Sequence, residues 1–210
     1  MPSPLELPPH VLSSLNRAGI PPRYLFSRFD NYQPTPENAA EFSRLSDEYM
    51  PALLDGGPNN LVLAGSVGTG KTHLACSIAY QALGAGIRTW FVPMNVLFHK
   101  LRLGRGQPLD DELGEHKLWM RATQVSLLIL DDVGASGMVA WNVETMDTLI
   151  SERYNALRPT IMTTNFAQSC LLDMGLSRVL DRITGYQDFW LTFVGDSHRP
   201  VCPKIDTDRL

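Results

Sequence analysis

A glycine-rich stretch constrains the fold of this chain more than any other feature. It reads Gly65-Ser66-Val67-Gly68-Thr69-Gly70-Lys71-Thr72, follows an apolar segment at 61–64 and precedes a helical pattern at 73–83. A strand, a turn of the form GxxxxGK[ST] and a helix make a P-loop in the context where this pattern is credible. The same letters could also form an ordinary glycine turn before a helix, so the rest of the chain must decide.

Each residue type of this motif has its own chemical reason. Gly65 and Gly70 let the backbone curl closely, so that consecutive N–H groups and the helix N-terminus face phosphate oxygens. Lys71 is expected to reach the terminal phosphates as a positive charge, and the Thr72 hydroxyl is placed to ligate Mg²⁺. The sequence therefore predicts an ATP and Mg²⁺ site. Its nucleotide-binding residues are Gly65, Ser66, Val67, Gly68, Thr69, Gly70, Lys71, Thr72 and His73.

Composition limits the class of protein. The chain has 210 residues, 44% of them hydrophobic, which is typical of a soluble globular protein with one sizeable core. No apolar run approaches the roughly eighteen residues of a membrane span, and the start lacks the pattern of a signal peptide, so we expect a cytoplasmic protein without a membrane partner. The three cysteines are too far apart for a disulfide framework or a zinc site. A net charge of −4 argues against a broadly basic nucleic-acid surface, although a local one remains compatible with it.

Strand and helix patterns alternate along the chain. Apolar strands are expected at 61–64, 87–92, 126–130, 160–164 and 189–194. Helices are expected from Pro36 to a stop near Pro51 and Gly56-Gly57-Pro58, at 73–83, at 94–103, at 141–157 and within 171–183. This alternation predicts an α/β fold of the P-loop NTPase class, with a five-stranded, mostly parallel sheet and helices on both faces. Residues 1–34 form an N-terminal arm with a short helix, and 35–210 form the ATPase domain.

Polar residues end two of the predicted strands. Asp131 and Asp132 follow the third strand, and Asn165 follows the fourth. The carboxyl ends of strands are where an open α/β sheet places its ligands. Asp131 is therefore a candidate metal residue, Asp132 a candidate to polarise the water that attacks the γ-phosphate, and Asn165 a candidate to orient that water. An Asn that only begins the next turn would look the same.

Three arginines near the end of the chain are further candidates for contact with the γ-phosphate. Arg178 and Arg182 are four residues apart and share one helix face, where a guanidinium could serve as an arginine finger for a neighbouring subunit. Arg199 follows the last strand. The pair at 178 and 182 could equally be an ordinary solvated face.

These motifs together resemble one family. The segments are Ile20-Pro21-Pro22-Arg23-Tyr24, GSVGTGKTHLA at 65–75, LLILDDVG at 127–134, RPTIMTTN at 158–165 and SRVLDRI at 177–183. They are similar to the AAA+ ATPases of the DnaC helicase-loader and IstB transposition-helper family, over about residues 20 to 200. The resemblance implies a AAA+ core without a C-terminal lid domain. It also implies head-to-tail rings or spirals on DNA, with the finger acting in trans.

The resemblance also implies roles for particular residues. Asn165 would be sensor 1, Arg182 the finger with Arg178 beside it, and Arg199 sensor 2. The arm before the sheet would line the adenine pocket through its aromatic side chains, Tyr24, Phe29 and Tyr32, although plain packing of the arm on the sheet explains these residues equally well.

A basic segment is the candidate DNA contact. Between residues 88 and 106 there is no acidic residue, and the basic ones are Arg88, His99, Lys100, Arg102 and Arg105. In a ring, several such short patches would line one channel for single- or double-stranded DNA. A solvated helix end is the alternative interpretation.

The sequence thus predicts a DNA-stimulated, oligomeric AAA+ ATPase that loads, recruits or regulates a replicative helicase or a transposase. Two other functions stay open. One is a monomeric P-loop kinase of small molecules, and the other is a nucleotide-gated scaffold with little turnover.

Overall fold

The computed structural model describes residues 7–57, 59–104, 114–135, 137–185 and 189–195. Its centre is a five-stranded sheet in the order β2-β3-β4-β1-β5, in which every neighbouring pair is parallel. The strands are β1 (Leu61–Gly65), β2 (Thr89–Pro93), β3 (Leu127–Val133), β4 (Thr160–Thr164) and β5 (Trp190–Phe193). The predicted α/β P-loop fold is confirmed.

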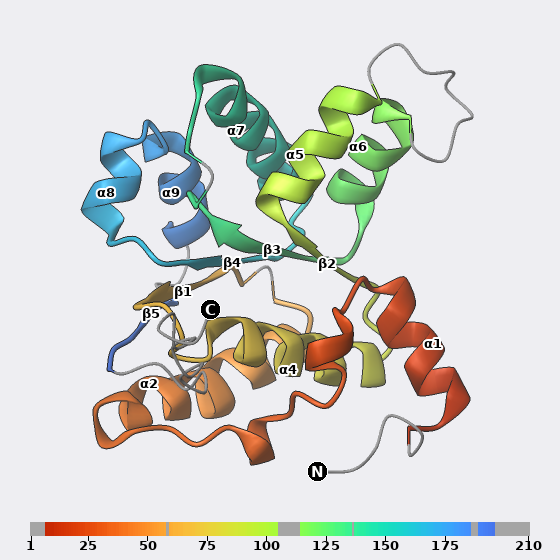
Figure 1. The fold of residues 1–210 in the computed structure, drawn as a ribbon, viewed down its shortest axis with the longest axis vertical. Helices are drawn as coiled ribbons and strands as arrows, with labels where there is room; N and C mark the ends of the chain where they lie inside the picture. The colour runs from red at the N-terminus through yellow and green to blue at the C-terminus, as the bar shows by residue number, and fades with distance from the viewer. Residues whose placement is uncertain (1–6, 58, 105–113, 136, 186–188, 196–210) are drawn as a thin grey trace, which may run out of the picture.

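Helices cover both faces of the sheet (Figure 1). On one face lie α1 (Pro9–Arg17), α2 (Ala39–Ser43), α3 (Met50–Leu54) and α4 (Lys71–Gly84). On the other lie α5 (Met94–Leu103), α6 (Glu115–Gln124), α7 (Ala140–Asn155), α8 (Gln168–Asp173) and α9 (Ser177–Thr184). Parallel strands joined by crossovers need this double cover, because both of their faces are apolar.

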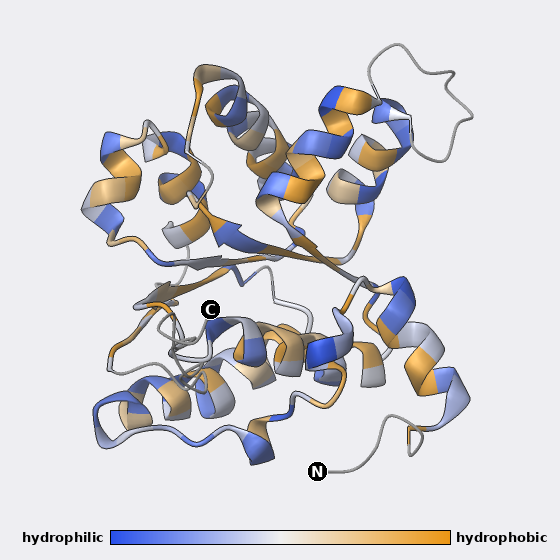
Figure 2. Ribbon diagram, viewed as in Figure 1, coloured by the Kyte–Doolittle hydropathy of each residue, from blue (hydrophilic) through white to orange (hydrophobic). Residues whose placement is uncertain are grey.

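Each face of the sheet has its own hydrophobic core. The core on the α4 side includes residues of the N-terminal arm, among them Leu15, Ile20 and Tyr32. The core on the other side joins Trp90 and Leu130 of the strands to helices α5 to α9. Figure 2 shows hydrophobic segments along the sheet, a hydrophilic end on β3, and helices of mixed polarity on both sides. The arm thus packs as part of the folded core, and its division from the rest at residue 34 stays a prediction.

A buried arginine of α7 connects the end of α6 with the start of β4. Arg153 of α7 has no exposed surface. Its guanidinium donates to Thr160 Oγ1 at 2.8 Å and to the carbonyls of Ala122, Val125 and Pro159 at 2.8, 2.9 and 2.6 Å. These bonds join the end of α6 to the start of β4. Burial lowers the pKa of Arg153 to about 9, and nearby Arg158 adds to the effect.

Several element boundaries differ from the sequence prediction. The helical segment after Pro36 includes a π-helical stretch (Arg44–Tyr49), passes Pro51 at the start of α3 and ends at Leu54, between the two stop signals of the sequence at Pro51 and at Gly56-Gly57-Pro58. The segment 171–183 holds parts of two helices separated at Gly175. Helix α6 is not predicted at all. Strand β3 runs through the Asp pair to Val133.

None of the described helices combines the length and the apolar character that a membrane span requires.

Candidate nucleotide site

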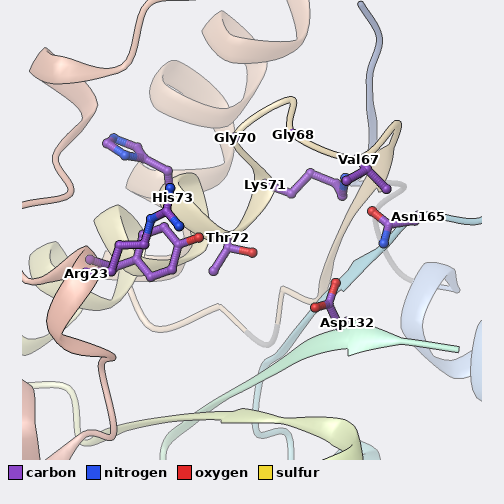
Figure 3. Close-up of a pocket in the computed structure, with 10 residues that line it drawn as sticks. Arg23, Val67, Gly68, Gly70, Lys71, Thr72, His73, Asp132 and Asn165 are labelled. Atoms are coloured by element: carbon purple, nitrogen blue, oxygen red, sulfur yellow. The ribbon is translucent and has the colours of Figure 1, made fainter. Parts of the chain in front are cut away.

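A cleft of about 440 Å³ opens at the carboxyl ends of β1, β3 and β4. Figure 3 shows side chains from four parts of the chain converging on it. Its lining residues are Arg23, Tyr24, Val67, Gly68, Gly70, Lys71, Thr72, His73, Asp132 and Asn165. Residues predicted from two separate motifs, the P-loop and the ends of β3 and β4, thus meet at one cleft.

Two glycines of the P-loop are fixed by close packing. Gly65 has φ +133°, and a Cβ there would lie 1.8 Å from the Phe193 carbonyl oxygen of the paired strand β5. Gly70 has φ +91°, and a Cβ would lie 2.6 Å from the ring of Tyr32. Both positions therefore require glycine for backbone conformation and for space.

Lys71 is turned inward along its own loop. Its ammonium donates to the carbonyl oxygens of Gly65 and Ser66 at 2.8 and 2.7 Å, and the residue is 5% exposed. The Lys71 ammonium is thus held against the P-loop backbone, beside the cleft (Figure 3). A bound phosphate would offer it an anionic acceptor in place of these neutral carbonyls.

Helix α4 begins at this loop without a side-chain cap. Gly70 is the N-cap residue and supplies no hydrogen bond from a side chain. The first-turn N–H groups of α4 consequently face the cleft with the positive end of the helix dipole. This arrangement suits an anion such as a phosphate.

The acidic end of β3 fits a hard metal ion. Asp131 is 6% exposed, and its Oδ1 accepts hydrogen bonds from the hydroxyls of Thr72 at 3.1 Å and Thr163 at 2.7 Å. Burial raises the pKa of Asp131, while the two hydroxyl bonds and Lys71 oppose that shift. One hydroxyl and one carboxylate side by side are the oxygen donors that Mg²⁺ takes when a nucleotide supplies the other ligands. No described cluster of three or more His, Cys, Asp or Glu residues suits a metal held by protein alone.

Asp132 has a different environment from Asp131. Its side chain is exposed and points into the cleft across from Asn165 (Figure 3). Its backbone is left-handed, with φ +57°, and its N–H donates to Thr163 Oγ1 at 2.9 Å. One carboxylate is therefore buried next to Thr72, and the other faces the space where a water and a phosphate would meet.

The aromatic residues of the arm separate into two groups. Tyr24, with its neighbour Arg23, lines the cleft. Tyr32 lies beneath the P-loop, where its hydroxyl donates to the Thr69 carbonyl at 3.1 Å, and Phe29 packs edge-on against Phe42. Among the described residues, the cleft lining includes neither Phe29 nor Tyr32, so their predicted adenine contacts have no support from position.

His73 joins α4 to the arm. Its Nε2 lies 3.0 Å from the Arg28 carbonyl oxygen, and its ring packs at 5.9 Å from that of Tyr32.

The two arginines of α9 lie outside the cleft of their own chain. Asp147 of α7 pairs with both, at 2.6 Å from Arg182 Nη1 and 3.6 Å from Arg178 Nη1. The Arg178 side chain is 79% exposed and that of Arg182 is 29% exposed. Arg199 lies outside the described residues.

The basic residues of the predicted DNA contact are split between two places. His99, Lys100 and Arg102 are exposed on α5, where Arg102 stacks over the Trp141 ring at 4.4 Å and donates to Asn142 Oδ1 at 3.0 Å. Arg88 precedes β2 and lines a separate pocket with Arg121. Arg105 lies outside the described residues.

The sequence pattern does not single out Arg23, Asp147 or Thr163. Arg23 lies in the segment Ile20-Pro21-Pro22-Arg23-Tyr24, next to the candidate Tyr24, and this position is a signal for it. Asp147 is identified only by its ion pairs with the α9 arginines. Thr163 is identified only by its hydrogen bonds to Asp131 and Asp132.

The family model described as IstB-like ATP binding protein matches residues 36–200 of this chain. The chain belongs to this family. Among its curated relatives is the uncharacterized protein YdaV of Escherichia coli K12, 27% identical over 190 residues, which are 89% of this chain and 73% of YdaV. Another is the replicative helicase loader DnaC of the same organism, 25% identical over 186 residues, 89% of this chain and 74% of DnaC.

Solved structures show the same fold as this IstB-like chain. The crystal structure of the DnaC helicase loader matches with a TM-score of 0.64 and 24% identity, over 84% of this chain and all of that one. The crystal structure of DnaI matches with a TM-score of 0.68 and 21% identity, over 86% of this chain and 94% of that one. The cleft thus lies in a domain of the IstB-like ATP-binding family that has a P-loop α/β fold.

Proposed function

We propose that this protein hydrolyses ATP between neighbouring copies of itself assembled on DNA, and that it thereby loads, recruits or regulates a replicative helicase or a transposase. One observation carries the proposal. Residues of the P-loop, Asp132 and Asn165 line one cleft, Asp131 lies behind it on Thr72, and the arginines of α9 lie outside it. The similarity to the helicase loader DnaC favours a helicase partner. A cytoplasmic location follows from such a partner.

The chemistry is attack of a water molecule on the γ-phosphate. Lys71 exchanges its two carbonyl partners for phosphate oxygens, and the uncapped start of α4 holds the remaining phosphate charge. Thr72 and Asp131 would hold Mg²⁺, which neutralises developing phosphate charge when bound. Asp132 accepts the proton of the attacking water, and Asn165 orients that water from the opposite side.

The adenine end of the nucleotide is assigned to the arm. Tyr24 offers an aromatic ring at the cleft, and Arg23 adds a cation beside it. Tyr32 contributes indirectly, because it supports the backbone of the P-loop at Thr69 and Gly70.

The arginine finger is assigned to the neighbouring copy. Arg182, with Arg178 beside it, would leave Asp147 and reach the γ-phosphate of the next subunit, where a guanidinium stabilises the transition state. Arg199 is kept as the sensor 2 candidate on the basis of the resemblance alone.

The DNA contact is assigned to the exposed face of α5. His99 and Lys100 are exposed there, and Arg102 presents a guanidinium already stacked on Trp141. Arg88 and Arg105 are the remaining candidates. Repetition of this short basic face around an assembly would give phosphate contacts to a protein whose net charge is −4.

ATP turnover and particle mass, measured together with and without single- and double-stranded DNA, test the proposal. DNA-stimulated hydrolysis accompanied by ATP-dependent growth into oligomers is the expected result. A protein that stays monomeric, ignores DNA and transfers phosphate to an added small acceptor would instead be a kinase. ATP-dependent assembly without turnover would make it a scaffold.

A further inference from the structure

The hydrogen-bond ladder between β3 and β4 contains an irregularity beside the Asp pair. Leu130 is paired with Met162, and the next pair along the strands is Val133 with Thr164. Two residues of β3, Asp131 and Asp132, therefore lie opposite one residue of β4, Thr163. Such a bulge re-aims side chains and leaves backbone groups without their ladder partners.

The hydroxyl of Thr163 fills this gap. The Asp132 N–H donates to Thr163 Oγ1 at 2.9 Å, and Thr163 Oγ1 donates to Asp131 Oδ1 at 2.7 Å. The direction of both bonds is fixed, because a backbone N–H can only donate and the hydroxyl has one proton to give. Thr163 is 1% exposed, so water does not compete for these bonds.

We propose that Thr163 is a positioning residue that sets both carboxylates of the site, a role that rests on the proposed ATP and Mg²⁺ function. Its hydroxyl holds the Asp131 carboxylate independently of Thr72, whose own hydroxyl is the other donor to the same oxygen. It also supports the left-handed backbone that turns Asp132 into the cleft. One hydroxyl thus links the metal-binding acid to the water-activating acid.

The next residue of β4 provides a matched control. Thr164 is also fully buried, and its hydroxyl donates to the Val133 carbonyl at 2.9 Å and accepts from the Phe166 N–H at 3.2 Å. It loses the same kind of bonds when replaced by valine. Neither partner belongs to the Asp pair, so Thr164→Val reports the structural cost alone.

The test compares Thr163→Val, Thr163→Ser and Thr164→Val in the full chain. Binding of a fluorescent ATP analogue is titrated first in EDTA and then against Mg²⁺ at fixed nucleotide, and turnover is measured in parallel. Thr163→Val should bind metal-free nucleotide within about twofold of wild type but require about tenfold more Mg²⁺, with turnover lowered about tenfold or more, as for other residues that orient metal ligands. Thr163→Ser should restore both values to within about threefold.

Three results would overturn the assignment: an unshifted Mg²⁺ requirement in Thr163→Val, failure of Thr163→Ser to rescue, or an equal shift in Thr164→Val. If Thr163→Val does not fold, Thr163→Ala is read against the same criteria. A wild-type protein whose nucleotide binding ignores Mg²⁺ would overturn the proposed metal site together with this role. Wild-type dependence on Mg²⁺ without a shift in the variant would overturn this role alone.

Discussion

The two sides of the proposed catalytic machinery are built differently. At the cleft, Lys71 and Asp131 are almost fully buried and bonded at 2.7 to 3.1 Å, and Gly70 is wedged against Tyr32. On α9, Arg178 is largely exposed, and one carboxylate from another helix pairs with both arginines. Close packing and short hydrogen bonds hold the side chains of the cleft, whereas the two α9 arginines share one partly exposed carboxylate. Such a difference suits a site that one copy prepares and a second copy completes.

The largest expected effect is on ATP affinity, when the positive charge of Lys71 is removed from the cleft. Lys71→Ala should weaken ATP binding about a hundredfold or more, equivalent to about 3 kcal/mol, because no other described lysine lines the cleft. Titration with a fluorescent ATP analogue measures this. Lys117→Ala, on α6 and outside the cleft, should bind as the wild type does. Unchanged affinity in Lys71→Ala would contradict the P-loop assignment.

The next largest expected effect is a loss of stability when the close contact between Gly70 of the P-loop and the Tyr32 ring is disturbed. Gly70→Ala combines a left-handed backbone with a clash against the Tyr32 ring, and should cost about 2–4 kcal/mol of unfolding free energy. Gly86→Ala has nearly the same φ, +82°, but open space around the new methyl, and should cost only about 1 kcal/mol. Urea unfolding of both variants compares them. Equal costs would show that the Tyr32 contact is unimportant.

We expect Tyr32 to make a smaller, pH-dependent contribution to the unfolding free energy. Burial raises the pKa of its hydroxyl to about 12 from an ordinary value of 10.0. Because the unfolded chain releases this proton first, the contribution of Tyr32 is complete below pH 10 and is lost as the pH rises towards 12, by about 1–2 kcal/mol. Unfolding free energies of wild type and Tyr32→Phe, measured from pH 9 to 12, should show a smaller decline in the variant. Parallel curves would contradict this prediction.

The smallest effect is expected on the α9 side. Asp147→Ala removes both ion pairs, yet it should lower the unfolding free energy by only about 1 kcal/mol or less, because the Arg178 pair is largely exposed and the Arg182 pair is still partly open to solvent. Chemical unfolding at low and high salt measures it. A loss of several kcal/mol would mean that the arginines are structural and not free to act elsewhere.

Much of the fold follows from simple patterns in the sequence. The sequence predicts a strand at each of the five observed positions, and the helix at 94–103 is predicted with both of its ends. The meeting of the P-loop with Asp132 and Asn165 follows from one rule, that strand ends share an edge of the sheet. The roles of these residues remain predictions.

Other features depend on contacts that the sequence does not reveal. The sequence prediction contains no helix at α6, and the buried Arg153 satisfies carbonyls that only the folded chain brings together. The left-handed backbone of Asp132 comes from a bulge, which depends on the register between two strands. For Tyr32 the sequence allows either contact with adenine or packing of the arm, and only the folded structure shows its ring against Gly70.

Mixing two inactive variants tests most directly whether two copies complete one site. Arg182→Ala retains a full cleft, and Asp132→Ala retains the arginine that a neighbouring cleft would need. With DNA present, the mixture should regain ATP turnover that neither variant shows alone, because some interfaces then combine an intact cleft with an intact arginine. Turnover no greater than the sum of the separate variants would contradict the account.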